Sequence, residues 1–152
     1  MSELRDLYQE LILDHGKRPR NFGPIATASH RADGRNPLCG DKLTVFLAIE
    51  GDRIVDVGFL GSGCAISMAS ASLMTEAIKG KAEAKVRTMF ERFHTGLTAK
   101  DEAAAAGAFA DLDKLVVFSG VREFPIRVKC AALPWRTLMA ALDHAQQSVK
   151  TE

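Results

Sequence analysis

The sequence predicts an α+β fold, in which a small antiparallel sheet of about three strands packs with helices that lie mainly on one of its faces. Two observations carry this prediction. Branched apolar residues at 43, 45, 47 and 49 alternate with Thr44, Phe46 and Ala48, and a return strand from Ile54 to Leu60 follows after a two-residue turn, as in a β-hairpin. Several other segments carry apolar residues three and four positions apart, which is the pattern of an amphipathic helix.

Size and charge restrict the class of protein. The 152 residues fit one domain with a full hydrophobic core, and no repeat or linker divides them, so we expect a single domain over residues 1–152. The net charge of +1 points to neither nucleic acid nor a membrane as partner. The N-terminus has early acidic residues and does not resemble a signal peptide, and no apolar run approaches the roughly 20 residues that span a bilayer. We therefore expect a cytoplasmic protein with reduced cysteines.

The chain begins with a predicted amphipathic helix over residues 3–15. Its apolar positions recur at helical spacing: Leu4, Leu7, Tyr8, Leu11 and Ile12. Gly16 is suited to end this helix, and His15 to serve as a cationic cap at its C-terminus. Residues 17–37 carry five glycines and prolines, so we expect a long loop that holds a short strand near residues 28–32.

The hairpin predicts which cysteines meet. A two-residue turn at 51–52 sets the register of its strands. Extended outward, this register pairs Glu50 with Arg53, Leu43 with Leu60, Asp41 with Ser62, and Cys39 with Cys64. Opposed Cα atoms lie roughly 4.5–5.5 Å apart, a separation that suits two thiolates on one zinc ion and equally suits a disulfide. A reducing compartment favours the thiolates.

Helices follow the hairpin. The segment Gly61-Ser62-Gly63-Cys64 leads into a predicted helix over residues 65–79, with Cys64 at its N-terminus. Further helices are expected around residues 86–93 and 100–110, and residues 112–121 predict a short helix or a buried turn. The last helix is expected to start near Pro134, after the segment that ends at Cys130.

Cys39, Asp41, Cys64 and Cys130 could together supply four ligands to a zinc ion. The spacing alone is a weak signal. Cys130 could instead be a small buried apolar residue, Asp41 a turn residue, and the glycines around Cys64 a simple strand-to-helix connection. Arg127 and Lys129 flank Cys130, where they could stabilise a thiolate or persulfide anion or form ordinary surface charge.

Other kinds of site have less support. The four histidines have no cysteine beside them in the sequence, so we leave His15, His30, His94 and His144 out of the ligand set. His144 is expected on the solvent side of the last helix. The phosphate-binding, dinucleotide-binding and serine-hydrolase motifs are all missing, so nucleotide chemistry and serine hydrolysis lack support.

Taken together, the sequence resembles the SufU family, within the IscU-like group of Fe–S assembly proteins. The resemblance rests on four stretches that span nearly the whole chain: Leu7 to Asn21, Asn36-Pro37-Leu38-Cys39-Gly40-Asp41, Gly61-Ser62-Gly63-Cys64-Ala65 to Ser70, and Ser119 to Ala131. Two features favour SufU over IscU within this group. Lys129 stands where IscU proteins carry a histidine, and residues 93–122 match an insertion that SufU proteins have.

The resemblance implies an IscU/SufU-like fold and a zinc-dependent sulfurtransferase. Cys39, Asp41, Cys64 and Cys130 would bind Zn²⁺, with Arg127 beside them. Cys39 would accept persulfide sulfur from a SufS-type cysteine desulfurase and pass it to a downstream Fe–S scaffold or apo-protein. Two alternatives stay open: a scaffold that assembles a [2Fe–2S] cluster on the same ligands, and a zinc-stabilised interaction domain without transfer chemistry.

Overall fold

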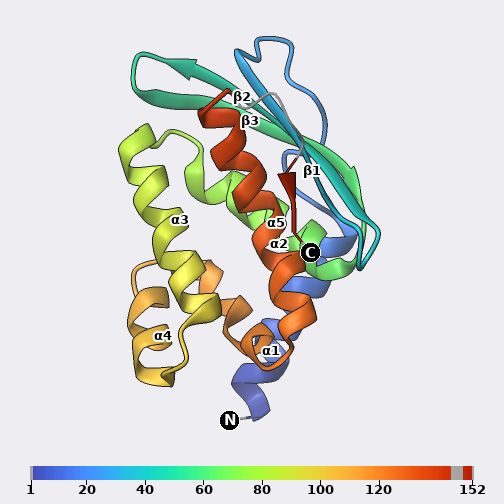
Figure 1. The fold of residues 1–152 in the computed structure, drawn as a ribbon, viewed down its shortest axis with the longest axis vertical. Coiled ribbons are helices and arrows are strands. Elements are labelled where there is room, and N and C mark those ends of the chain that lie inside the picture. Colours follow the sequence, from blue (N-terminus) through green and yellow to red (C-terminus); the bar gives the residue numbers. More distant parts are fainter. Residues whose placement is uncertain (1, 145–148, 152) are drawn as a thin grey trace.

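The computed structural model describes residues 2–144 and 149–151. One helix precedes three consecutive strands, the other helices follow one another, and a short strand comes last (Figure 1). They are α1 (Ser2–Lys17), β1 (His30–Asn36), β2 (Asp41–Glu50), β3 (Arg53–Ser62), α2 (Ala65–Ile78), α3 (Glu83–Thr98), α4 (Glu102–Phe109), a 3₁₀ helix η1 (Asp113–Glu123), α5 (Pro125–Leu142) and β4 (Val149–Lys150). This confirms the predicted α+β fold.

The sheet has four strands in the order β3-β2-β1-β4. The first three are antiparallel, as predicted, and the two-residue β4 adds a parallel pair with β1, which makes the sheet mixed. Strand β1 is longer and lies later in the chain than the short strand expected near residues 28–32. It is a partner of β2, so the loop from Pro37 to Gly40 is itself a hairpin connection.

The predicted register of the second hairpin is wrong by one residue. The pairs Glu50–Arg53 and Ile49–Ile54 hold, but Ala48 then faces Asp56, so β3 carries one extra residue at Val55. Such a β-bulge offsets every pair beyond it. Leu43 therefore faces Gly61 and not Leu60, and Ser62 faces Lys42 and not Asp41.

The last helix starts earlier than predicted, because Pro125 and not Pro134 occupies its first turn. Pro134 is a buried residue in the helix interior. A proline there leaves carbonyl groups of the preceding turn without their helical donor. The hydroxyl of Ser70, on α2, donates to the carbonyl oxygen of Ala131 at 2.6 Å in that turn. The helix nevertheless continues through Pro134, and Cys130 comes to lie within α5.

The core lies between the sheet and the helices, which cover one face of the sheet (Figure 1). An aromatic cluster joins α3, α4, η1 and α5 around Phe93. Its ring stacks on Trp135 at a centroid distance of 5.1 Å and meets Phe109 and Phe118 edge to face. The segment 112–121, predicted to be a short helix or a buried turn, forms most of η1, with Leu112 as its N-cap. Among the described helices, none is both long and apolar enough to cross a membrane.

Candidate metal centre

The loop that carries Cys39 is a tight connection between β1 and β2. Asn36, the last residue of β1, holds it: its carbonyl accepts the N–H of Cys39 at 3.2 Å, and its side-chain oxygen accepts the N–H of Leu38 at 3.3 Å. Gly40 has φ of 70°, a conformation that glycine adopts without strain. These contacts place the half-buried Cys39 thiol at the edge of the sheet.

Asp41 connects the sheet to α2. Its carboxylate is 1% exposed, and its Oδ1 accepts the backbone N–H of Cys64 at 2.9 Å. The adjacent Gly63 makes this approach possible, because a Cβ at Gly63 would collide with Oδ1 of Asp41 and with Oγ of Ser67. Gly63 is therefore required by close packing, beyond its place in a strand-to-helix connection.

Cys130 is buried in α5, and its sulfur lies 3.2 Å from that of Cys39. The side-chain amide of Asn36, also buried, donates to the Cys130 sulfur at 3.5 Å. A thiol packed only as an apolar residue would lack these polar neighbours. The geometry thus makes Cys130 part of a polar cluster, although 91 residues separate it from Cys39 in the chain.

The structure brings three of the four predicted ligands into one group. One ligand atom each from Cys39, Asp41 and Cys130 lie within 4.8 Å of one another. Cys64 borders this group, with its sulfur 3.9 Å from Oδ2 of Asp41. The predicted pairing of Cys39 with Cys64 across the hairpin is wrong, since Cys39 sits in the β1–β2 connection and meets Cys130 instead.

Cys64 is the N-cap of α2, and its sulfur accepts the backbone N–H of Ser67 at 3.5 Å. The pKa of the Cys64 thiol is lowered to about 6. The largest cause is a hydrogen bond from Cys130, and the backbone N–H of Ser67 acts in the same direction, while burial acts against both. The same contact with Cys64, followed by burial, raises the pKa of the Cys130 thiol. The two shifts have opposite directions, so the Cys64 thiol is the more acidic of the pair.

A cation completes the cluster. The guanidinium of Arg127 lies 3.9 Å from the Cys39 sulfur. The pKa of Arg127 is raised, first by its hydrogen bond with Cys130 and then by the negative charges of the cysteines. This placement agrees with the position expected for Arg127 beside the ligands. Lys129 points to a different part of the molecule, described below.

The histidines lie apart from the described ligand group. His144 is exposed just past the end of α5, as expected. The prediction that His15 is a cationic cap is wrong. Its side chain is buried against α2, with Nδ1 2.7 Å from the hydroxyl of Ser72, and burial followed by the charge of Arg20 lowers its pKa.

The residues present fit a zinc ion. Thiolate sulfur and carboxylate oxygen are donors that zinc accepts, at bonds of about 2.0–2.3 Å, and the grouped atoms are close enough to reach one ion. Asn36 and Ser67, which sequence reasoning missed, surround the donors. Asn36 stands in the motif that carried the family resemblance, so its place there was the available signal.

Apolar side chains surround the open side of this cluster. Leu38, Phe124 and Ile126 are each about 60% exposed and line a surface hollow together with Cys39 and Cys64. We call these three residues the apolar rim. Exposed apolar groups around a reactive thiol are typical of a surface that meets another protein.

The comparisons place the chain in a family. The sequence pattern of the NifU-like N-terminal domain matches residues 7–131. The chain therefore belongs to the NifU-like N-terminal domain family, the IscU-like group that includes SufU. This confirms the family resemblance stated above.

Individual relatives agree with this assignment. The chain is 40% identical over 137 residues, 90% of each protein, to the zinc-dependent sulfurtransferase SufU of Bacillus subtilis (strain 168). It is 32% identical to the iron–sulfur cluster assembly scaffold protein IscU of Streptococcus pyogenes serotype M1, over 93% of this chain and 86% of that protein. A crystal structure from Fervidobacterium islandicum AW-1, described as an iron–sulfur cluster assembly scaffold protein for the SUF system, superposes with a TM-score of 0.77 at 38% identity and covers 88% of this chain and 94% of that one.

Proposed function

We propose that this protein is a sulfur carrier in Fe–S cluster biogenesis, which accepts persulfide sulfur on Cys39 from a SufS-type cysteine desulfurase. The observation that carries the proposal is the position of Cys39. Its thiol is half-buried, lies 3.9 Å from a guanidinium, and opens onto the apolar rim. The 40% identity to a protein named SufU supports the same reading.

The transfer is a thiol exchange. The Cys39 thiolate attacks the terminal sulfur of the persulfide on the desulfurase, a new S–S bond forms, the old S–S bond breaks, and the desulfurase cysteine leaves as a thiolate. Arg127 stabilises the negative charge on the Cys39 sulfur before the attack and on its persulfide afterwards. Once Leu38 and Ile126 are covered by the partner, water is excluded from the exchange.

Cys39, Asp41, Cys64 and Cys130 are the residues that we propose hold a zinc ion. Bound zinc would keep the cysteines deprotonated and protect them from oxidation. Two contacts support this set before metal arrives. The N–H of Cys64 orients the Asp41 carboxylate, and the amide of Asn36 faces the Cys130 sulfur.

A [2Fe–2S] scaffold is the second candidate function. It is favoured by the 32% identity to a protein named as an IscU scaffold, since the same three sulfurs and one carboxylate could ligate iron. Lys129 weakens it, because a lysine cannot supply the imidazole ligand that a histidine at this position would offer.

The decisive experiment is intact-mass spectrometry of the zinc-loaded protein after incubation with a SufS-type desulfurase and cysteine. We expect one added sulfur, mapped to Cys39 and removed by a thiol reductant, and none on Cys39→Ala. An active desulfurase that leaves the wild-type mass unchanged would reject the carrier function. A cluster that forms on the protein anaerobically and transfers intact to an apo-ferredoxin would favour the scaffold instead.

The ligand set has a separate test. We expect one zinc per wild-type chain by elemental analysis, and weaker retention against a chelator after Cys130→Ala. Equal retention by both proteins would remove Cys130 from the set.

A further inference from the structure

A cavity of about 810 Å³ lies between α3, α5 and the short strand β4. Its lining includes Val128, Lys129 and Ala132 of α5 but not Cys130 between them, so it is distinct from the candidate metal centre. Its volume falls within the roughly 300–1,000 Å³ typical of small-molecule sites. The proposed sulfur transfer makes no use of it.

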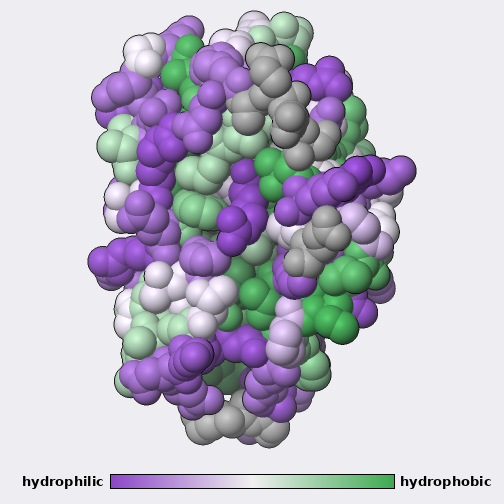
Figure 2. Space-filling model, in the orientation of Figure 1, coloured by the Kyte–Doolittle hydropathy of each residue, from purple (hydrophilic) through white to green (hydrophobic). Residues whose placement is uncertain are grey.

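Part of the cavity wall is apolar. Phe90 and Leu97 contribute from α3, and Val128 and Met139 from α5. Figure 2 shows apolar surface on this face of the molecule between bands of hydrophilic side chains. A wall of this kind favours a ligand with an apolar or aromatic body.

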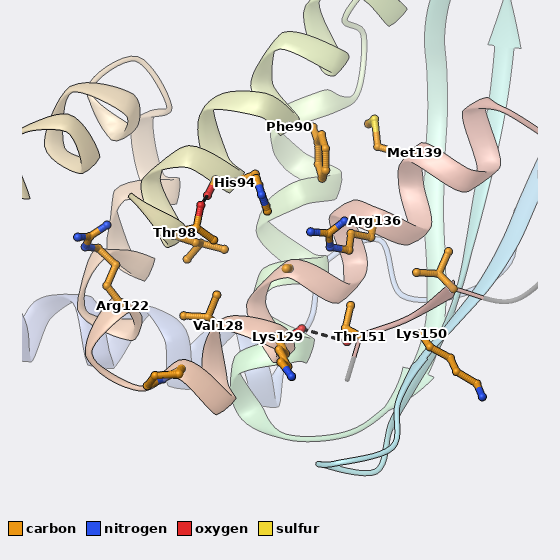
Figure 3. Close-up of a pocket in the computed structure, with 14 residues that line it drawn as sticks. Phe90, His94, Thr98, Arg122, Val128, Lys129, Arg136, Met139, Lys150 and Thr151 are labelled. Carbon is orange, nitrogen blue, oxygen red and sulfur yellow. Dashed lines mark hydrogen bonds between the residues drawn. The ribbon is translucent and has the colours of Figure 1, made fainter. Parts of the chain in front are cut away.

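The polar part of the wall is cationic. It contains four positively charged side chains, those of Arg122, Lys129, Arg136 and Lys150. Among the described lining residues there is no aspartate or glutamate. Arg122 is engaged by the carbonyl oxygen of Gly96 at 2.9 Å, and Lys150 points outward in Figure 3. Arg136 is directed into the space between the helices, and in the described part of the chain it forms no ion pair.

His94 faces the same space. Its Nδ1 atom is buried and has no hydrogen-bond partner among the described residues, and its ring points toward Arg136 (Figure 3). Unpaired buried nitrogen atoms are uncommon and are often satisfied by a ligand. Burial, followed by the charge of Arg136, lowers the pKa of His94. The imidazole thus lies beside a cation that has no ion-pair partner among the described residues.

We propose that this cavity binds a small organic anion, whose apolar or aromatic body packs against Phe90, Val128 and Met139 and whose carboxylate, phosphate or sulfonate group faces Arg136, Lys129 and His94. The anion would give Arg136 a counter-charge and would give the Nδ1 atom of His94 a partner. An inorganic anion alone would leave the apolar wall of the cavity without a partner.

A matched pair of fluorescent probes tests the proposal on the full chain. The first is 8-anilinonaphthalene-1-sulfonate, and the second is N-phenyl-1-naphthylamine, which has the same ring system without the sulfonate. We expect the sulfonate probe to bind the wild-type protein more tightly than the neutral probe. Arg136→Gln and Lys129→Gln should each weaken binding of the sulfonate probe, Arg136→Gln by about tenfold, since a charge-assisted hydrogen bond is lost.

Arg31→Gln is the matched control, because Arg31 is an exposed arginine on β1 outside the cavity, and it should leave the affinity unchanged. Arg136 is itself exposed, and circular dichroism of each variant checks that the fold is kept. Absence of binding, equal affinity for the two probes, or equal affinity of wild type and both cavity variants would overturn the proposal.

Discussion

Oδ1 of Asp41 accepts the backbone N–H of Cys64 at 2.9 Å, a contact that ties the first residue of β2 to the N-cap of α2. The Asp41 carboxylate thus contributes a structural hydrogen bond in the metal-free protein. This dual use of one side chain predicts that changes at Asp41 alter stability as well as metal binding.

Replacement of Asp41 by alanine is expected to lower the free energy of unfolding of the reduced, metal-free protein by about 1–3 kcal/mol, because a hydrogen bond to a buried carboxylate is lost. Asp41→Asn keeps an acceptor oxygen and should cost less. Urea denaturation in the presence of a chelator measures both. Equal stability of the three proteins would show that the contact contributes nothing to folding.

Gly63→Ala is expected to destabilise the protein by about 1–3 kcal/mol, since its Cβ would displace the Asp41 carboxylate and the Ser67 hydroxyl. Zinc retention should fall with it. Gly107→Ala is the matched control. Gly107 lies in α4, where a Cβ would meet no other segment of the described chain within 4 Å, and alanine favours helices by up to about 1 kcal/mol. Denaturation curves of the two variants should therefore move in opposite directions.

Arg127→Ala is expected to slow alkylation of Cys39 by iodoacetamide about two- to fivefold at fixed pH, because the thiolate loses a nearby exposed cation. Arg127→Lys should restore part of the rate, and added salt should narrow the difference. The measurement uses metal-free protein and peptide mapping to follow Cys39 alone. An alkylation rate insensitive to both substitutions would exclude an electrostatic role for Arg127.

The apolar rim predicts a loss of partner binding without a loss of fold. Ile126→Ser is expected to raise the concentration of protein that half-saturates a SufS-type desulfurase, while zinc content and thermal stability stay unchanged. Val55→Ser is the control, because Val55 is 38% exposed but lies at the far end of β3 from the cluster. If both variants behave alike in the transfer assay, the rim is not a docking surface.

His15 predicts a pH dependence of stability. Burial lowers the pKa of His15 in the folded protein. Below about pH 6.5, His15 is therefore protonated in the unfolded chain but not in the folded protein. The free energy of unfolding then falls as the pH drops toward the folded pKa. This contribution is fully present above pH 6.5. His15→Gln, which can still contact Ser72, should reduce the difference in stability between pH 8 and pH 5. An unchanged difference would assign the acid sensitivity to other groups.

Local sequence patterns determined much of this protein. Helical spacing of apolar residues predicted α1, α2 and α3, alternation predicted β2, and these periodicities depend only on near neighbours. An alanine-rich run predicted α4, and the turn after β2 predicted β3. The ligand loop and the segment before α2 were also recognisable, and with them the family. The predicted ligand residues Cys39, Asp41 and Cys130 do meet in one group.

Only the tertiary structure decided how they meet. The bulge at Val55 moved Asp41 beside Gly63, and α5 continues through Pro134, packed against α2. The pairing of Cys39 with Cys130, and the cationic cavity behind α5, likewise join segments distant in the chain. Such contacts depend on how whole helices and strands pack against one another. A local pattern of residues does not determine the free energy of that packing.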